Sequence, residues 1–219
     1  DYEPIHSVYV DDFYIDKFEI TNKLYSLCVR NNVCDEPIQK YSRTRSTYYE
    51  DKSFDEFPVI YVNWEMAQSY CEWRGMNLPT EAQWEKAARG SYDFESSRYR
   101  KYPWGYSSDY DCSYANFTTC LFDTALVDSR EKGTSYFGIY NLAGNVSEWV
   151  QDWYSEDYYQ TLDEHAINPK GIVAGTHKAV RGGSWSSSDY GLKSYDRDYE
   201  LIEHSSDTIG FRCARDATP

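Results

Sequence analysis

Hydrophobic and polar positions change over short distances along this chain, and the pattern predicts short elements. Residues 8–16 alternate β-branched or aromatic side chains with polar ones, which predicts one or two short strands. Apolar residues at helical spacing then predict a helix that begins at Thr21 or Asn22 and ends at the Asn31-Asn32 pair. The apolar stripe of this helix is predicted to consist of Leu24, Tyr25, Leu27 and Cys28.

Two further helices have clear boundary signals. One is predicted to start at Asn63, a suitable N-cap, and to end at Gly75, after a short extended segment over 58–62. The other has the strongest local signal in the chain, because Thr80 and Gln83 can form a capping box and Gly90 can end the helix. Residues 36–57 are predicted to form a polar loop.

The chain beyond residue 91 predicts little regular structure. It is rich in Tyr, Ser, Gly, Asp and Trp, and strands are predicted only near 138–141, 148–154, 180–185 and 210–214. A few helices with many brief strands indicate an α+β fold with extensive loops. The length of 219 residues and the lack of a dividing linker predict one domain over 1–219.

Charge and hydropathy exclude several classes of partner. The formal net charge of −14 opposes binding to nucleic acid, whose phosphates are held by clustered Lys and Arg. No stretch approaches the roughly 20 apolar residues that a transmembrane helix needs. The first four residues, Asp-Tyr-Glu-Pro, lack the basic and apolar regions of a signal peptide, so we interpret the chain as a mature or trimmed product.

Six cysteines indicate an oxidising compartment. Two close pairs flank short segments and two cysteines are left over, a pattern that predicts three disulfides. A zinc site is the weaker alternative, since neither close pair has CxxC spacing and the four histidines are scattered. Disulfides are typical of extracytoplasmic proteins, so we expect a secreted, cell-surface or periplasmic location. The predicted pairs are Cys28 with Cys34, Cys112 with Cys120, and Cys71 with Cys213.

Eight separated segments occur in the order that is typical of one family. Together they resemble the formylglycine-generating enzyme family, also called the sulfatase-modifying-factor domain. The resemblance implies a compact fold related to C-type lectin-like domains, and it also implies a Cys71–Cys213 bond. The segments are 16–22 (DKFEITN), 58–71 with Pro58-Val59, Asn63-Trp64 and Tyr70-Cys71, 78–85 (LPTEAQWE), 103–105 (PWG), 115–116 (AN), 138–149 (GIYNLAGNVSEW), 181–185 (RGGSW) and 210–213 (GFRC).

The resemblance implies a calcium site in the loop over 141–148. Its ligands would be the side chains of Asn141 and Glu148 and the main-chain carbonyls of Gly144 and Val146. These groups suit calcium, which takes six to eight oxygen ligands, and Gly144 lets the loop curl. A hydrogen-bonded turn without metal is the alternative.

A second calcium site is implied at Asn116, the carbonyl of Phe117 and an acidic residue, for which Asp123 is the nearest candidate. The loop here is shorter than the family pattern and carries Cys120, so a disulfide and a metal are alternatives at this place. The triplets that begin at Asn116 and Asn145 also match the N-glycosylation pattern.

The chemistry of the family's oxidising enzymes is expected to be absent. In the oxidising enzymes of the family that this chain resembles, two cysteines that follow the Gly-Gly-Ser-aromatic motif bind copper. Ser187 and Leu192 stand at these positions here, and neither can replace a thiolate on Cu(I). We therefore expect calcium but no copper, no catalytic residues and no formylglycine-generating activity.

The residues that follow this motif suggest a recognition surface, because they mix polar and aromatic side chains. Ordinary loop composition in a Tyr-rich chain is the alternative. The leading hypothesis is a non-catalytic, calcium-binding domain that recognises a protein, peptide or glycan. An oxidative tailoring enzyme acting on a peptide or siderophore, and a structural subunit of an extracellular assembly, are the other hypotheses. The candidate ligand-binding residues are Trp185, Ser187, Asp189, Tyr190 and Arg197.

Overall fold

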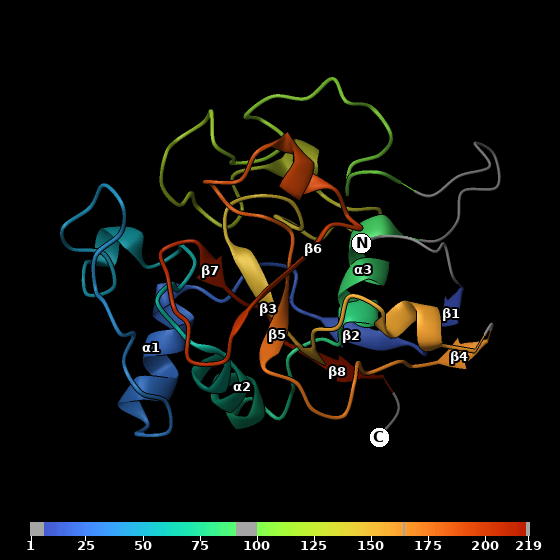
Figure 1. The fold of residues 1–219 in the computed structure, drawn as a ribbon. Coiled ribbons are helices and arrows are strands. Elements are labelled where there is room, and N and C mark those ends of the chain that lie inside the picture. The colour runs from blue at the N-terminus through green and yellow to red at the C-terminus, as the bar shows by residue number, and fades with distance from the viewer. Residues whose placement is uncertain (1–6, 91–99, 164, 218–219) are drawn as a thin grey trace.

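The computed structural model describes residues 7–90, 100–163 and 165–217, so the first residues of the chain lie outside it. Short elements joined by long loops make up this part of the chain (Figure 1). The helices are α1 (Asn22–Arg30), α2 (Trp64–Trp73) and α3 (Glu81–Arg89). The strands are β1 (Val8–Tyr9), β2 (Phe13–Ile15), β3 (Ser147–Trp153), β4 (Ala166–Ile167), β5 (His177–Arg181), β6 (Arg197–Leu201), β7 (Ile209–Gly210) and β8 (Ala214–Asp216).

A four-stranded sheet in the order β6-β5-β3-β7 lies at the centre. Strand β3 runs antiparallel to β5 and parallel to β7, with Glu148 opposite both Arg181 and Gly210. Two small ladders, β1 with β4 and β2 with β8, join the N-terminal segment to later parts of the chain. The loops over 100–145, green to yellow in Figure 1, form a layer above the sheet.

Both faces of the central sheet are covered, which explains why successive residues of β3 are buried. Trp149 and Val180 pack on one face against α1 and α2. Val150 and Ala179 pack on the other face against α3. Successive side chains of a strand point to opposite faces, so a strand between two layers carries a continuous apolar run.

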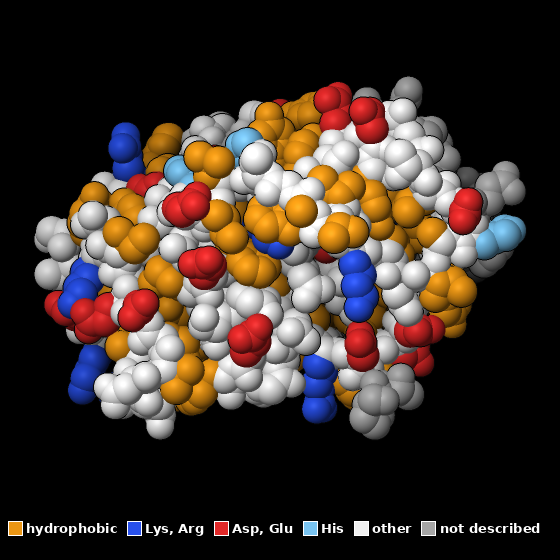
Figure 2. Space-filling view, turned by 60° about the horizontal axis from the view of Figure 1, so that its bottom comes forward, with side chains coloured by type: hydrophobic (Ala, Val, Ile, Leu, Met, Phe, Trp, Pro, Cys, Tyr) orange, Lys and Arg blue, Asp and Glu red, His pale blue; other side chains and the backbone are white. Residues whose placement is uncertain are grey.

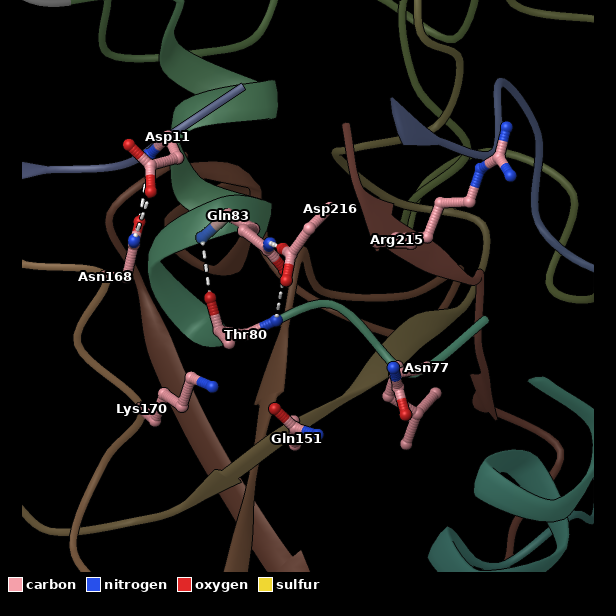
Figure 3. A pocket seen from close by; sticks show the side chains of 11 residues that line it. Asp11, Asn77, Thr80, Gln83, Gln151, Asn168, Lys170, Arg215 and Asp216 are labelled. Carbon is pink, nitrogen blue, oxygen red and sulfur yellow. Dashed lines mark hydrogen bonds between the residues drawn. The ribbon is translucent and has the colours of Figure 1, made fainter. Parts of the chain in front are cut away.

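The predicted helix boundaries are confirmed. The side chains of Thr21 and Asn63 cap α1 and α2, and Thr80 forms the capping box of α3 with Gln83 (Figure 3). The predicted stripe of α1 is wrong in part. Its Tyr25 and Cys28 are buried, but Leu24 and Leu27 are exposed because Asn22 takes the inward position beside Phe54.

The predicted strands are confirmed in part. No strand forms over 138–141, because the amides of Ser135 and Gly138 bond within a tight turn. Strand β5 starts earlier than expected and ends at Arg181, where Gly182 and Gly183 adopt positive φ angles. The strands β4 and β6 were not predicted, since their exposed edges lack an apolar pattern.

The surface is mixed in character. Figure 2 shows hydrophobic side chains interspersed with polar ones, and acidic and basic groups scattered over the face, several of them side by side. Within the described residues, no helix is both long and apolar enough to span a bilayer.

Candidate functional site

The loop over 141–148 is held in a conformation that only a few residue types adopt. Asn141, Gly144 and Asn145 have φ angles of 53°, 80° and 65°. Asparagine and glycine tolerate this left-handed region better than other residues. A Cβ atom on Gly144 would lie 2.4 Å from the carbonyl oxygen of Asn116, so this position also needs glycine for space.

Glu148 forms a fully buried ion pair at the end of this loop. Its carboxylate oxygens accept from the Arg212 guanidinium at 2.6 and 2.7 Å and from the Trp84 indole at 2.8 Å. Arg212 also donates to the carbonyl oxygens of Asp16, Lys17 and Tyr140. The loop is therefore tied to α3, to the segment between β7 and β8 and to the segment before α1.

Glu19 is a buried carboxyl that sequence reasoning did not single out, although it lies inside one of the family segments. It accepts hydrogen bonds from the side-chain amides of Asn141 at 2.7 Å and Asn145 at 3.0 Å. Burial raises the pKa of Glu19 to about 8, Arg212 opposes this shift, and Glu148 adds to it.

These residues fit a cation. The side-chain oxygen of Asn141 is buried and has no hydrogen-bond partner. The cluster also brings two carboxyls, Glu19 and Glu148, to one guanidinium, and a bound cation would favour the ionised form of Glu19. A carboxylate oxygen has two lone pairs, which allows Glu148 to contact Arg212 and ligate an ion together. The two side chains predicted as ligands therefore belong to one buried, oxygen-rich cluster.

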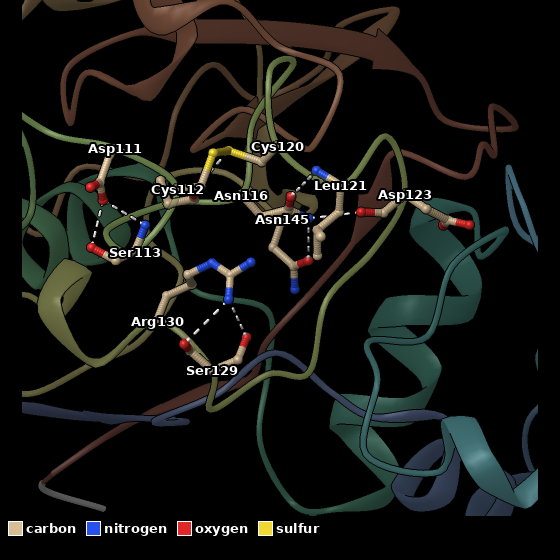
Figure 4. Close-up of a disulfide and its surroundings, with 11 residues drawn as sticks. Asp111, Cys112, Ser113, Asn116, Cys120, Leu121, Asp123, Ser129, Arg130 and Asn145 are labelled. Carbon is tan, nitrogen blue, oxygen red and sulfur yellow. Dashed lines mark hydrogen bonds between the residues drawn. A yellow bond between two sulfur atoms is a disulfide. The ribbon is translucent and has the colours of Figure 1, made fainter.

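The residues of the second implied site do not fit calcium in this arrangement (Figure 4). The Asp123 carboxylate accepts from Ser42, from Thr44 and from the amide of Thr124, and Arg45 lies 3.2 Å away. These donors keep the pKa of Asp123 low in spite of its burial. Asn116 donates to the main chain of Asp123, and the Phe117 carbonyl accepts from Cys120. Protein donors take the place that an ion would need.

The asparagines of the two triplets that match the glycosylation pattern are inaccessible in the folded chain. Asn116 and Asn145 are both completely buried, and their side chains are hydrogen-bonded to one another and to the main chain. Neither can carry a glycan in this fold. Among the described residues, no group of three or more His, Cys, Asp or Glu side chains is placed to hold a metal.

All six cysteines are paired as predicted. The bonds are Cys28–Cys34, Cys71–Cys213 and Cys112–Cys120, and no free thiol is left in the chain. The Cys71–Cys213 bond joins α2 to the segment between β7 and β8.

A groove with a volume of about 600 Å³ opens beside Trp185. Trp185 is itself largely buried and donates from its indole to the carbonyl of Asp207, while Phe122 is 59% exposed. The amide of Trp185 donates to the carbonyl of Asn145, so the groove rests directly on the 141–148 loop. Its lining consists of Arg43, Thr44, Thr118, Phe122, Trp185, Ser186, Asp207 and Thr208.

The predicted ligand-binding residues do not form one surface. Asp189 and Tyr190 are exposed, whereas Ser187 is half-buried and accepts from the amide of Ser184. Arg197 lies in a buried ion pair, with Nε 2.8 Å from one carboxylate oxygen of Glu81 and a second nitrogen 3.0 Å from the other. The side chain of Arg197 therefore forms an internal ion pair and is not part of a ligand-binding surface.

Comparison with known proteins identifies the family. The model of the sulfatase-modifying factor enzyme 1-like domain matches residues 1–217. The chain belongs to this family. Formylglycine-generating enzyme of Thermomonospora curvata is 35% identical over 179 residues, covering 73% of this chain and 55% of the enzyme. The inactive Cα-formylglycine-generating enzyme 2 of Bos taurus is 31% identical over 179 residues, covering 74% of this chain and 51% of that protein.

Longer proteins also contain such a domain. Serine/threonine-protein kinase pkn1 of Chlamydia pneumoniae is 33% identical over 225 residues, which cover 97% of this chain and 34% of the kinase. The chain thus spans about a third of the length of the kinases it matches and about half that of the enzymes.

Solved structures agree on the fold of this sulfatase-modifying-factor domain. Treponema denticola variable protein 1 matches with a TM-score of 0.73 and 22% identity, covering 95% of this chain and 86% of that one. PvdO from Pseudomonas aeruginosa matches with a TM-score of 0.71 and 21% identity, covering 93% and 80%. The fold is that of formylglycine-generating enzymes, a C-type lectin-like variant, as the sequence predicted.

Ser187 and Leu192, at which the resemblance leads one to expect the cysteine pair of an oxidising enzyme, have different surroundings. The Ser187 hydroxyl is engaged by the main chain at Ser184. Leu192 is fully buried in an apolar cluster with Tyr102, Ala115 and Ala143, against which further aromatic rings pack.

Proposed function

We propose that this domain is a non-oxidising recognition module that acts outside the cytoplasm and binds a polypeptide segment in the groove beside Trp185. The proposal rests on the contrast between the buried side chain of Leu192 and the open groove beside Trp185. Leu192 is sealed among aromatic rings, whereas the groove a few residues earlier in the chain is open. With every cysteine in a disulfide, the chain has no thiol to offer Cu(I).

The groove suits an extended peptide. Arg43 and Asp207 offer opposite charges, and the hydroxyls of Thr118 and Ser186 can pair with peptide amides and carbonyls. The exposed ring of Phe122 provides an apolar anchor for one side chain of the peptide. The three disulfides support a location in an oxidising compartment.

Calcium would have a structural part in this function. Asn141, Gly144, Val146 and Glu148 would hold the ion, with Glu19 adding negative charge, and the ion would supply the positive charge that the buried cluster lacks. The cluster leads to the groove through Asn145, whose side chain donates to Glu19 and whose carbonyl accepts from the amide of Trp185. Calcium would therefore stiffen the floor of the groove.

A selection of random linear peptides displayed on phage tests the groove. We expect an enriched sequence motif whose synthetic peptide binds the wild-type domain, and we expect Phe122→Ser to weaken binding about tenfold or more. Leu201→Ser is the matched control, because Leu201 is a similarly exposed apolar residue on β6 outside the groove. The proposal fails if no motif is enriched, or if Phe122→Ser and Leu201→Ser bind the peptide equally well.

Thermal unfolding with calcium or with a chelator tests the ion separately. At a hundredfold excess over the dissociation constant, calcium should stabilise the domain by about 2.7 kcal/mol. Asn141→Ala should abolish this gain, while Asn32→Ala, an exposed asparagine at the end of α1, should retain it. An unchanged melting temperature in wild-type protein on chelation would remove calcium from the proposal and leave the peptide test standing.

A further inference from the structure

A second pocket, with a volume of about 190 Å³, lies where the start of α3 meets β3 and β8 (Figure 3). It shares no lining residue with the groove beside Trp185. Five segments that are distant in sequence contribute to it, and most of their side chains are polar. The lining consists of Asp11, Asn77, Leu78, Thr80, Gln83, Gln151, Asn168, Lys170, Ala214, Arg215 and Asp216.

The walls of this pocket are fixed by hydrogen bonds among its own residues. Asn168 donates to the Asp11 carboxylate at 2.7 Å and accepts from the Asp11 amide at 2.9 Å. Gln83 donates to Asp216 at 3.1 Å and also completes the capping box with Thr80. These pairs hold two carboxylates and two amides in place before any ligand arrives.

Several polar side chains of the lining are left for a ligand. Within the described residues, the side-chain amide of Gln151 makes no hydrogen bond and the side chains of Lys170 and Arg215 make no ion pair, and no dashed line reaches any of the three in Figure 3. The main chain of Gln151 is held nonetheless, because its amide donates to Pro79 and its carbonyl accepts from Lys178. Its side chain is therefore positioned but unused.

The segment that carries Lys170 is also fixed. Asn168 and Gly171, on either side, have φ angles of 49° and 76°, and a Cβ atom on Gly171 would lie 2.9 Å from the Cβ atom of Asp152. The main chain therefore turns sharply against β3 at this point. Such a turn fixes the main chain that carries Lys170, whose exposed side chain lines the pocket.

The charges of the lining cancel, since it contains two carboxylates, Asp11 and Asp216, and two cations, Lys170 and Arg215. In a chain with a net charge of −14, this balance disfavours a strongly charged ligand at this place. We propose that the pocket binds a neutral, hydroxyl-rich ligand, namely a single sugar residue. The proposal is independent of the function assigned to the groove.

The lining complements a sugar in three respects. Each hydroxyl of a sugar both donates and accepts, as does each of the four side-chain amides in the lining. Leu78 and Ala214 add small apolar surfaces that can cover a C–H face. The volume lies below the roughly 300–1,000 Å³ of pockets for drug-sized ligands, which limits the occupant to one small ring.

Titrations followed by heteronuclear NMR test this proposal. The probes are the methyl glycosides of glucose, galactose, mannose and N-acetylglucosamine, with glycine and succinate as zwitterionic and anionic comparisons. We expect saturable shifts of the side-chain amide signals of Gln151 and Asn77 with at least one glycoside. Gln151→Ala and Lys170→Ala should each weaken that binding about tenfold.

Gln160→Ala is the control, because Gln160 is an exposed amide outside the pocket, and it should bind the glycoside like the wild type. Lys170 is exposed, so its variant reports on the site even if Gln151→Ala disturbs β3. Saturation by glycine or succinate in place of every glycoside overturns the proposal, as does equal glycoside binding by Lys170→Ala and wild type. Phe122→Ser should leave glycoside binding unchanged, which separates this site from the groove.

Discussion

Glu148 illustrates, at the scale of single residues, how a buried charge depends on its partner. Its carboxylate and the Arg212 guanidinium are both fully buried and contact each other through two hydrogen bonds. Removing one member of a buried pair leaves the other charge without compensation. The pair therefore makes the 141–148 loop sensitive to a single substitution.

We expect Glu148→Ala to lower the free energy of unfolding by about 3–5 kcal/mol, since Arg212 would be left buried and unpaired. Urea unfolding followed by tryptophan fluorescence measures this loss. Lys23→Ala is the control, because it breaks an ion pair with Glu56 that is exposed on both sides, and it should cause no resolvable change. Equal losses in the two variants would contradict the role of the pair.

Leu192 gives a second prediction for a single residue. A buried leucine and a hydrogen-bonded serine stand at the two positions that the resemblance assigns to thiolates. The domain supplied with copper and oxygen should therefore not convert a sulfatase-motif cysteine to formylglycine. Mass spectrometry of a substrate peptide, with heat-treated protein as the control, measures the conversion. Aldehyde formation that depends on the folded protein would contradict the prediction.

Resemblance located some of these residues and missed their neighbours. It placed Asn141 and Glu148 in one loop, and the structure buries both in one cluster. It did not single out Glu19 or Arg212, because their contacts join segments far apart in the sequence. It also grouped Arg197 with surface residues, whereas Arg197 is buried against Glu81, a contact that no local pattern encodes.

At the scale of helices and strands, an element can be predicted from the sequence when the contacts that form it join residues close together in the chain. The capping box of α3 is a contact between Thr80 and Gln83, three residues apart, and it was read directly from the sequence. Strand β6 owes its existence to pairing with β5 along its whole length, and its own residues are half exposed. Elements made by long-range pairing carry too weak a local signal to be predicted.

The contact between β3 and α3 should make stability depend on pH. Asp152 of β3 accepts from the amide of Glu81 at the start of α3, and burial followed by the charge of Glu81 raises the pKa of Asp152 to about 7. Lys178 of β5 and Arg197 of β6 oppose this shift. The folded chain then holds a proton that the unfolded chain releases, so the contribution of Asp152 to stability falls as pH rises from about 4 through 7.

We expect Asp152→Asn to remove this dependence, because an asparagine oxygen can still accept from Glu81 and does not ionise. Relative to wild type, the variant should gain stability between pH 5 and pH 8. Urea unfolding across that range measures the difference, with Asp128→Asn, at an exposed loop position, as the control. A difference between Asp152→Asn and wild type that is constant with pH would contradict the assignment.

At the scale of the whole molecule, the Cys71–Cys213 bond closes the longest disulfide loop, with a sequence separation of 142 residues. It ties α2 to the end of the chain, next to Phe211, which packs in the same apolar cluster. The other two bonds close loops with separations of 6 and 8 residues. In the chain-entropy model, a longer loop constrains the unfolded state more strongly.

Replacing both cysteines of a pair by serine should therefore have unequal effects. We expect a loss of about 5 kcal/mol for Cys71–Cys213 and about 2 kcal/mol for Cys28–Cys34. Chemical unfolding of the two double variants under the same conditions measures the ratio. A larger loss at Cys28–Cys34 would show that native-state packing, and not loop closure, dominates.

The burial of Asn116 and Asn145 has a consequence for how this domain is produced. Glycosylating secretory pathways modify such triplets while the chain is still being translocated, before burial can protect them. A glycan on Asn145 would then have to fit between Glu19 and the main chain of Ala125, where no space exists. Secretion from yeast or animal cells should trap the chain in a misfolded state that export to a bacterial periplasm avoids, and Ser147→Ala, which destroys the second triplet, should partly relieve the trap.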